Sequence, residues 1–516
     1  MGYKEQFSEV FGEDSGWSLS EPDFAVSGKG GGDVSESLDP GDWEEFRQLA
    51  HAVVDRAVEH LKGTRARPAW RQVPEESESV FRRDVPLGGT PLSEVVDDFF
   101  QNVLTYPIGN THPRFWGWVG GAGTPGGVIA ETLTGLMNSV PGNFNDAAAR
   151  VEDQVIAWMR EVMGFPEGSS GILTSGGSVA NLIGITAARD ARAGYDTVIQ
   201  GVGAEPGKLV LYASTEVHSS VFKSAQILGL GRDAVRLIGV NDDYEINVEE
   251  LSDRIAADRA EGLRPFAIVG SAGTVNTGAT DDLDALADIA QREGLWFHVD
   301  GAFGALVALS PRLRHKVAGM DRAHSVAFDF HKWMSVQYDA GCVLVRDPGA
   351  HRRPFSVSAD YLAAFPRGTA SRADTANLRG PQLSRSFRAL KVWMTIREHG
   401  VEKFGRIIEQ NVADIQYFAG RIEQADDFEL LAPIPLNVAV FRYNPGGLSS
   451  EALDALNREL VMKIQESGIA VPSSTYVRGK FAIRVANVNH RTVPADFDLF
   501  LAALRRFGER QLADGS

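Results

Sequence analysis

The chain has 516 residues, of which 43% are apolar and 23% are charged. These proportions are typical of a globular protein with a large core, and they exclude a wholly disordered chain or a fibrous repeat. The formal net charge of −17 opposes broad binding to nucleic acid or to an anionic membrane. Cys342 is the single cysteine, which excludes an intramolecular disulfide and a cysteine-based zinc cluster.

The N-terminus is polar and acidic and lacks the apolar core of a signal peptide. No segment approaches the roughly eighteen consecutive apolar residues of a membrane span. We therefore expect a cytoplasmic protein. Residues 1–38 predict a flexible N-terminal tail, because the glycine-lysine cluster at 28–33 has no strand before it and does not fit a phosphate loop. From Asp39 apolar residues recur at helical spacing, which predicts a helical arm over 39–110.

Short apolar runs alternate with helical patterns between residues 150 and 350. This alternation predicts an α/β fold, with a large, mostly parallel sheet domain over 111–390 that helices cover on both faces. In such sheets ligands bind beyond the carboxyl ends of the strands. The strands are expected at 172–174, 209–213, 267–271, 295–299 and 342–345, and helices at 179–190, 248–260 and 283–293.

The remaining segment, 391–516, predicts a small C-terminal α+β domain. A long amphipathic helix is expected over 383–399, where Gly400 stops it. Strands at 437–443 and 481–485 and a closing helix near 495–510 follow.

The first motif with chemical potential is SGGSVAN at 175–181, where a strand runs directly into a helix. Gly176 and Gly177 let the backbone approach a ligand closely, and the helix N-terminus favours a phosphate. Ser178 can cap the helix or donate its hydroxyl group. The alternative is an ordinary helix cap after a tight turn.

The second motif is HVDGA at 298–302. Asp300 ends an apolar strand, where an unpaired carboxylate is costly, so we expect it to have a cationic partner. His298 and Asp300 alternate onto one face of the strand and could bind a metal, but no third ligand is evident nearby. A carboxylate that faces a protonated ring nitrogen fits better, and we expect no metal.

Two further motifs also follow strands. Lys332, next to His331, follows an apolar strand, where we expect a crowded amine that can act as a nucleophile toward a carbonyl; the alternative is a surface lysine. His218 could stack on an aromatic cofactor or move a proton, or it could simply cap the next helix. Because all four motifs follow strands of one sheet, they point into one crevice. Together they supply the parts that pyridoxal 5'-phosphate requires.

At this point the chain resembles the pyridoxal-phosphate-dependent group II amino-acid decarboxylases, a family that includes aromatic-L-amino-acid, glutamate and cysteine-sulfinate decarboxylases. The resemblance covers nearly the whole chain, from about residue 40 to 510. It rests on HPRF at 112–115, SGGSVAN at 175–181, HSSV at 218–221, GT at 273–274, HVDGA at 298–302, HKW at 331–333 and RSFRALKVW at 385–393.

The resemblance implies an aspartate-aminotransferase-like fold (fold type I of the pyridoxal-phosphate enzymes) and a homodimer with active sites at the subunit interface. It implies that Lys332, His218 and Asp300 are catalytic: Lys332 binds the cofactor covalently, His218 stacks on its ring and Asp300 keeps the ring nitrogen protonated. Ala302 would pack against the ring. The remaining implied cofactor-binding residues are Gly176, Gly177, Ser178, Thr274 and His331.

The implied reaction is decarboxylation of an L-amino acid to the amine and CO2. Trp116 and Trp118, near the expected pocket wall, favour an aromatic substrate. The first alternative is an acidic amino acid such as glutamate, aspartate or cysteine sulfinate, whose side chain Arg114 could bind. The second is aldehyde synthesis or oxidative deamination with the same cofactor. A non-catalytic scaffold is disfavoured, because the lysine, aspartate and histidine are all present.

Two departures from the family pattern bear on the chemistry. Residues 362–384 contain no tyrosine, whereas aromatic-branch relatives carry a proton-donating tyrosine in this loop. Tyr361 is the nearest upstream tyrosine, and Ala376 is the position where a loop tyrosine would align. In addition, Asp329 stands where relatives often have asparagine, and its charge would be awkward near a phosphate unless it pairs with a cation.

Overall fold

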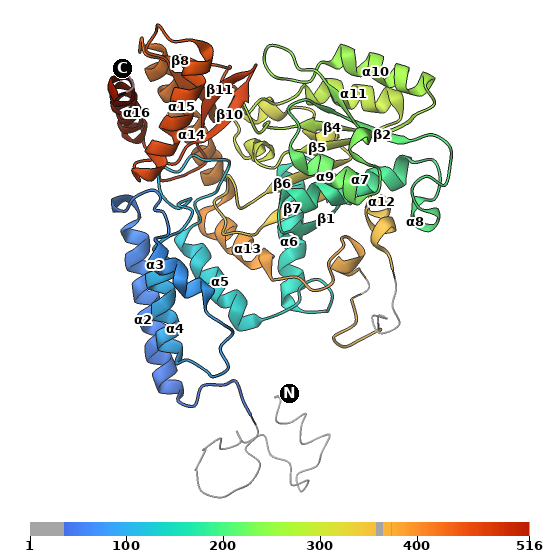
Figure 1. The fold of residues 1–516 in the computed structure, drawn as a ribbon. Helices are drawn as coiled ribbons and strands as arrows, with labels where there is room; N and C mark the ends of the chain where they lie inside the picture. Colours follow the sequence, from blue (N-terminus) through green and yellow to red (C-terminus); the bar gives the residue numbers. More distant parts are fainter. Residues whose placement is uncertain (1–35, 358–364, 373, 515–516) are drawn as a thin grey trace, which may run out of the picture. The chain divides into compact units, whose positions relative to one another are not determined.

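The computed structural model describes residues 36–357, 365–372 and 374–514. The chain divides between Asp55 and Arg56 into two units, and helix α2 (Trp43–Lys62) crosses this boundary. The larger unit, residues 56–516, contains both sheets (Figure 1). Most of the predicted tail, including the glycine cluster at 28–33, lies outside the described residues.

A seven-stranded sheet forms the centre of the larger unit, with the strand order β1-β7-β6-β5-β4-β2-β3. Strand β7 runs antiparallel to both of its neighbours, whereas the other pairs are parallel. The predicted α/β fold with a mostly parallel sheet is thus confirmed. The bounds are β1 Ser170–Thr174, β2 Leu209–Ser214, β3 Val235–Ile238, β4 Arg264–Ser271, β5 Trp296–Asp300, β6 Ser325–Asp329 and β7 Gly341–Val345.

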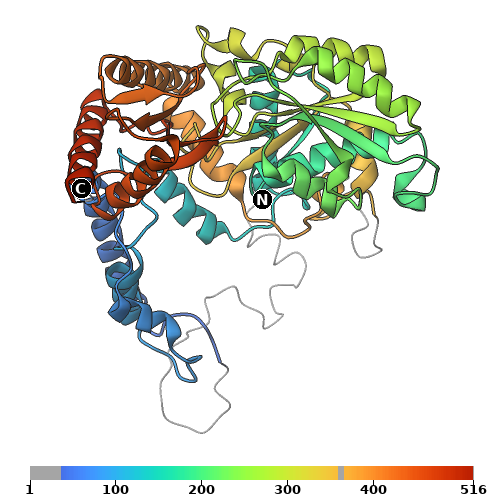
Figure 2. The ribbon, with the colours of Figure 1, turned by 45° about the horizontal axis from the view of Figure 1, so that its top comes forward.

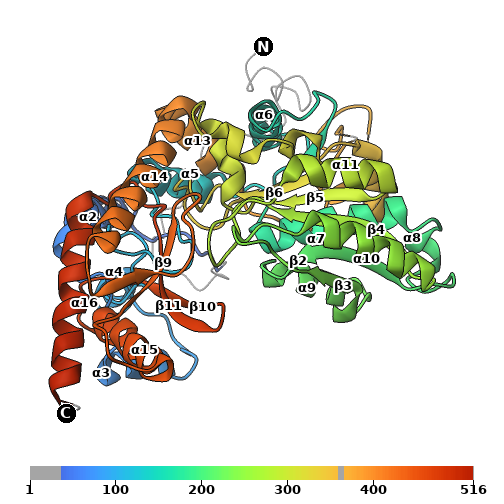
Figure 3. The ribbon, with the colours of Figure 1, turned by 90° about the horizontal axis from the view of Figure 1, so that it is seen from above.

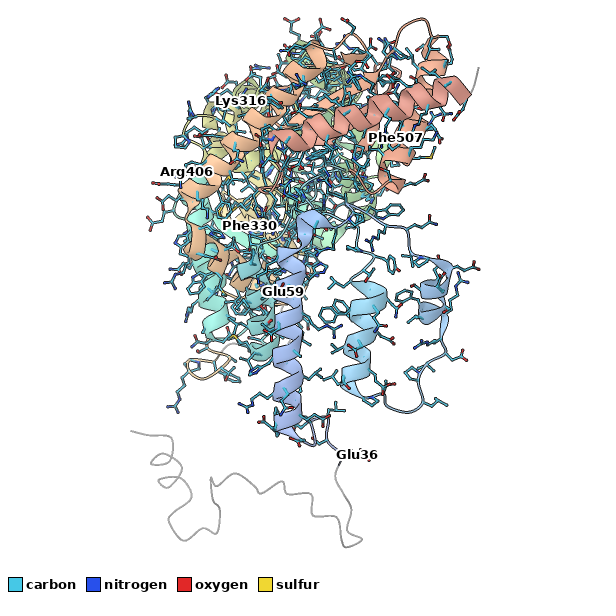
Figure 4. All side chains as sticks on the ribbon, turned by 90° about the vertical axis from the view of Figure 1, so that its left-hand side faces the viewer. Glu36, Glu59, Lys316, Phe330, Arg406 and Phe507 are labelled. Carbon is cyan, nitrogen blue, oxygen red and sulfur yellow. The ribbon has the colours of Figure 1, made fainter. Side chains whose placement is uncertain are left out.

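Helices cover both faces of this sheet because its strands are apolar on both sides. On one face, α10 (Val248–Ala260) and α11 (Leu283–Glu293) pack through Ile255 and Leu286 against Ile268 and Phe297. On the other face lie α7 (Gly177–Arg192) and α9 (Ser219–Ile227). Figure 4 shows Phe330, which is fully buried, among the packed side chains of the interior.

The second sheet is antiparallel, with four strands in the order β10-β11-β9-β8. Its strands are β8 Phe428–Leu430, β9 Val438–Tyr443, β10 Ser473–Val477 and β11 Lys480–Ala486. The helices α14 (Val401–Glu423), α15 (Ser450–Glu466) and α16 (Pro494–Asp514) lie around it (Figures 2 and 3). The predicted small α+β segment is therefore present.

The expected helix over 383–399 begins only at Arg388, as α13 (Arg388–His399). Residues before it are held in an irregular path by Arg385, whose guanidinium pairs with Glu152 at 2.6 Å and donates to the Leu173 carbonyl. This buried tertiary contact overrides the local helical pattern. Gly400 ends α13 at φ +71°, as expected, and α14 follows at once.

No helix among the described residues has the length and apolar character to cross a membrane. Further α-helices complete the described part of the chain. They are α3 Glu75–Glu78, α4 Leu92–Asp98, α5 Pro125–Met137, α6 Ala147–Val162, α8 Thr197–Gln200 and α12 Pro348–Arg352.

Candidate active site

The turn from β1 into α7 brings backbone amides to the edge of the large sheet. Gly176 has φ +152°, a conformation that residues with a side chain rarely adopt. A Cβ atom on Gly341 would lie 2.5 Å from the Gly176 Cα, so these two backbone segments approach too closely for a side chain at position 341. Gly176, Gly177 and Ser178 line a cavity of about 300 Å³ at the N-terminus of α7. Such a helix N-terminus favours an anion.

Lys332 reaches the same cavity from the loop after β6. Its Nζ lies 3.1 Å from Oδ2 of Asp329, which is 1% exposed. The charge of Asp329 thus has the cationic partner that its position requires, although its Oδ1 has no hydrogen-bond partner among the described residues. His331 lies beside this pair, with Nε2 at 3.6 Å from Asp329 Oδ2, and burial lowers its pKa.

Asp300 closes β5 at the floor of the site. Its Oδ2 accepts a hydrogen bond from Asn181 Nδ2 at 2.8 Å, and its Oδ1 accepts one from the Ala302 amide at 3.2 Å. Both donors are neutral groups, so the expected protonated ring nitrogen as partner of Asp300 stays a prediction. Both ring nitrogens of His298 are engaged, by Ser325 and Asn181, so they do not face an open metal position. The described residues hold no cluster of three or more metal-ligating side chains.

His218 caps the N-terminus of α9, where its Nδ1 accepts the Ser220 amide hydrogen bond at 3.2 Å. Burial lowers its pKa, so the neutral imidazole is favoured at pH 7. Thr274 lies further along the site, but its hydroxyl bonds Thr277 at 3.1 Å and accepts from the Ala279 amide. Thr274 therefore contributes to the wall while its hydroxyl stabilises its own loop.

A second cavity, of about 260 Å³, adjoins the first. The two share His218, Ala302 and Lys332 in their walls, so they form one continuous site. The second cavity extends from Asp300 towards Trp118 and Arg484. Sequence-predicted residues from the ends of β1, β2, β5 and β6 thus lie together, as the strand-end argument expected.

Arg484, on β11, is a buried cation at the far wall of the second cavity. It is 2% exposed, and burial lowers its pKa to about 10. Its Nη1 donates to the Trp118 carbonyl at 2.7 Å and its Nε to the Asn276 carbonyl at 3.3 Å. Its Nη2 has no partner among the described residues. An acceptor in the cavity would satisfy it.

Two expectations about the substrate end of the site are wrong. Trp116 is fully buried in the core of the small sheet, where it stacks on Phe497 at 4.7 Å, so of the two predicted tryptophans only Trp118 lines the cavity. Arg114 pairs with Asp496 at 3.4 Å instead of reaching the cavity. Ala376, where a loop tyrosine would align, is 3% exposed in an apolar cluster. Tyr361 lies outside the described residues.

Sequence reasoning missed Arg484 and left Asn181 without a role. An arginine inside the buried run FAIRV at 481–485 was an available signal, because a charged residue in an apolar strand requires partners. Asn181 lies four residues after Gly177, about one helical turn further on the same face of α7. That spacing alone places its side chain close to the phosphate cradle.

The residues present fit pyridoxal phosphate. Gly176 and Gly177 line the cavity at the α7 N-terminus without side chains, so a phosphate group can approach their backbone closely. A lysine, a carboxylate at a strand end and a histidine surround the adjoining space. This donor set is the one that binds a pyridine ring carrying an aldehyde and a phosphate.

Comparison with known proteins gives the same answer. Residues 74–444 match the pyridoxal-dependent decarboxylase conserved domain. The chain is 30% identical to the aromatic-L-amino-acid decarboxylase of Bacillus atrophaeus over 470 residues, which cover 90% of this chain and 96% of the relative. Among solved structures, mouse CSAD superposes with a TM-score of 0.84 at 26% identity, covering 91% of this chain and 99% of CSAD.

A second similar structure is the glutamate decarboxylase domain of the diaminobutyrate-pyruvate transaminase and L-2,4-diaminobutyrate decarboxylase from Vibrio parahaemolyticus. It has a TM-score of 0.78 and 28% identity, and the match covers 92% of this chain and 97% of that one. The family model spans more than half of the sequence. The chain therefore belongs to the pyridoxal-dependent decarboxylase family and is a pyridoxal-phosphate-dependent amino-acid carboxy-lyase.

Proposed function

We propose that the protein decarboxylates an aromatic L-amino acid to the corresponding amine and CO2. The observation that carries the proposal is the apolar wall beside Lys332, where Trp118, Val119 and Phe303 line the cavity of about 260 Å³. Such a wall offers an aromatic side chain burial and ring contacts. The activity of the Bacillus atrophaeus relative supports the same substrate class.

The cofactor, when bound, supplies an electron sink for the bond that breaks at the substrate Cα. The proposed tasks of the protein are holding and orienting. The α7 N-terminus with Gly176, Gly177 and Ser178 binds the phosphate, and Lys332 supplies the amine that retains the cofactor. Asp300 holds the proton on the ring nitrogen, because a carboxylate at that position stabilises the positive charge.

We assign the proton that replaces CO2 at Cα to His218. Its neutral ring accepts hydrogen bonds at Nδ1, so the proton is on Nε2. His218 lines both cavities, which places it between the expected cofactor and substrate positions. This role suits the absence of tyrosine from residues 362–384.

A second candidate substrate class is an acidic amino acid. It is favoured by Arg484, whose Nη2 has no hydrogen-bond partner in the described part of the chain and whose buried charge would bind a side-chain carboxylate. The wall near Arg484 also carries Ser473, Ser474 and Asn276. These polar groups suit a carboxylate better than a plain aromatic ring.

We further propose that the enzyme is a homodimer with active sites at the subunit interface. Helix α5 supports this, because Ile129, Leu133, Leu136 and Met137 are each at least 40% exposed on it. Light scattering tests the dimer: a monomeric mass at micromolar concentration would contradict it.

We also propose a domain division and a location. The proposed domains are 39–110, 111–390 and 391–516 after the tail. A cytoplasmic location is supported by the single buried thiol of Cys342.

The test of the proposed function is a screen of the proteinogenic amino acids and cysteine sulfinate with purified holoenzyme. Amine, CO2, ammonia and peroxide are all measured. We expect equal amounts of amine and CO2 from an aromatic substrate, with little peroxide. Turnover confined to glutamate, aspartate or cysteine sulfinate would establish the acidic alternative instead. Peroxide equal to CO2 would establish aldehyde formation.

A further inference from the structure

A chain of hydrogen bonds lies directly behind the floor of the active site. Asn181, which is 1% exposed on α7, is its branching point. Its Nδ2 donates to Asp300 Oδ2 at 2.8 Å and to Ser220 Oγ at 2.9 Å, and its Oδ1 faces His298 Nε2 at 2.9 Å. One amide thus contacts the supports of both proposed catalytic side chains.

The direction of each hydrogen bond follows from the chemistry of the groups. The Asp300 carboxylate only accepts, so the NH2 group of Asn181 must face it, and the amide oxygen must face His298. Burial lowers the pKa of His298 to about 4, so the ring is neutral at pH 7. An amide oxygen cannot donate, and therefore His298 carries its proton on Nε2 and donates it to Asn181.

The far end of the chain is compatible with this tautomer. His298 Nδ1 lies 2.8 Å from Ser325 Oγ and, lacking a proton, accepts the hydroxyl hydrogen. Ser325 Oγ in turn accepts from Trp296 Nε1 at 2.8 Å. Trp296 is an indole that can only donate, so the Ser325 hydroxyl hydrogen remains available to His298. Each of these groups is buried, and each has its hydrogen bonds satisfied.

The second branch reaches His218. Ser220 Oγ accepts from Asn181, so its own hydrogen points to His218 Nδ1, 2.8 Å away. With Nδ1 accepting, a neutral His218 carries its proton on Nε2. That is the tautomer with a proton available to the cavity, since His218 lines both cavities. The orientation that the Asp300 carboxylate imposes on Asn181 is therefore consistent with the hydrogen bonds around both histidines.

We propose that Asn181 is a positioning residue that orients the Asp300 carboxylate and holds the Ser220 hydroxyl as a second donor to Nδ1 of His218, with His298, Ser325 and Trp296 as its support. The inference rests on the cofactor-facing roles proposed above for Asp300 and His218. Asn181 acts on Asp300 directly and on His218 through Ser220. Its removal leaves the Asp300 carboxylate free to rotate and leaves the Ser220 hydroxyl without the donor that fixes its position.

The test uses the full-length holoenzyme loaded with pyridoxal phosphate labelled with ¹⁵N in its ring. Solid-state NMR reads the chemical shift of the ring nitrogen without substrate, while kcat and the cofactor dissociation constant are measured in parallel. For Asn181→Ala we expect the ring nitrogen to move from the protonated toward the neutral shift. We expect kcat to fall roughly 10- to 100-fold, as for other partners that orient a functional side chain. The cofactor dissociation constant should change less than kcat.

Asn457 provides the matched control. It is fully buried in α15, and its amide accepts from the Tyr443 amide at 2.8 Å and donates to the Tyr443 carbonyl at 2.9 Å. Asn457→Ala should cost stability but leave the ¹⁵N shift and kcat as in the wild type. A wild-type shift and kcat in Asn181→Ala, or equal changes in both variants, would overturn the proposal.

A second pair of variants keeps the test decisive if Asn181→Ala does not fold. His298→Gln retains an N–H group near the position of Nε2 and should stay close to the wild-type shift, whereas His298→Leu should shift like Asn181→Ala. Identical shifts in the two His298 variants overturn the inference. Asp300→Asn distinguishes the proposed role of Asp300 from the positioning role of Asn181. If the ¹⁵N chemical shift in Asp300→Asn equals that of the wild type, the role of Asp300 is refuted. If the shift changes in Asp300→Asn but not in the Asn181 and His298 variants, only the positioning role is refuted.

Discussion

The two cavities that meet at Lys332 are built in different ways. The cavity at the α7 N-terminus is lined by residues that directly follow β1, β2, β5 and β6 of one sheet. The adjoining cavity combines the loop after β4 with Trp118 and with Ser473 and Arg484 of the small sheet. The first is thus set by local sequence at strand ends, and the second by contacts between segments hundreds of residues apart.

The polar groups of the two cavities also differ. In the first, Asn181 donates hydrogen bonds to the Asp300 carboxylate and to the Ser220 hydroxyl that supports His218, while the buried acceptor Asp329 Oδ1 has no partner among the described residues. In the second, Arg484 keeps an N–H group without a partner among the described residues. A hydrogen-bonded network fixes the orientation of its members, whereas an unsatisfied buried donor favours an incoming acceptor. We therefore expect Asn181 to preorganise the proposed cofactor end, and the donor in the second cavity to influence substrate selection.

The largest expected effect comes from Lys332, one of the three residues that line both cavities. Lys332→Ala removes the amine proposed to retain the cofactor and should lower kcat by roughly 10³-fold or more. Circular dichroism should show an intact fold. Lys223→Ala is the matched control, because Lys223 follows His218 in the next helix but does not line either cavity. Wild-type turnover in Lys332→Ala would contradict the proposed site.

Asp300→Ala should have the next largest effect. The loss of a charge-assisted hydrogen bond that strengthens in the transition state costs about 3–4 kcal/mol, or ~10²–10³ in kcat. The phosphate cradle is unchanged, so cofactor affinity should fall much less than kcat. Steady-state kinetics and equilibrium dialysis give the two numbers. Near-normal turnover in the variant would refute the role of Asp300 as the partner of the ring nitrogen.

A smaller effect is expected in the substrate cavity. Trp118→Ala removes an aromatic wall and should lower kcat/KM for an aromatic substrate by about 5- to 10-fold, mostly through KM, because ring contacts contribute about 1 kcal/mol. Trp118→Phe keeps a ring and should retain most of the activity. Equal kcat/KM values for wild type and Trp118→Ala would show that the aromatic wall does not select the substrate.

The smallest effect concerns stability outside both cavities. His351 is fully buried between Ser170 and the Arg379 carbonyl, and burial lowers its pKa to about 3. The unfolded chain therefore protonates His351 more readily than the folded chain does. The contribution of the neutral His351 ring to the free energy of unfolding is fully present above pH 6.5 and is lost progressively as the pH falls below 6.5. His351→Gln should therefore lose roughly 1 kcal/mol less than wild type between pH 7.5 and 5.5.

Denaturant unfolding at the two pH values measures this difference. His315→Gln is the control, since His315 is exposed and its replacement should leave the pH dependence unchanged. A wild-type pH dependence in His351→Gln would show that His351 does not carry this penalty.

The contrast between the cavities also explains what sequence could predict. Lys332, Asp300 and His218 each follow an apolar strand, so local pattern and sheet topology sufficed to place them together. Trp116 and Arg114 could not be placed in this way, because only tertiary packing decides that the former stacks on Phe497 and the latter pairs with Asp496. The late start of α13 has the same origin, in the pair between Arg385 and Glu152.

The most direct test of the account is the position at which the cofactor is attached. Borohydride reduction of the holoenzyme fixes the cofactor to the amine that holds it, and peptide mapping by mass spectrometry then identifies that residue. The account predicts the label on the peptide that contains Lys332, at the junction of the two cavities. A label on Lys223, or on any other lysine, would contradict the site from which every other role has been argued.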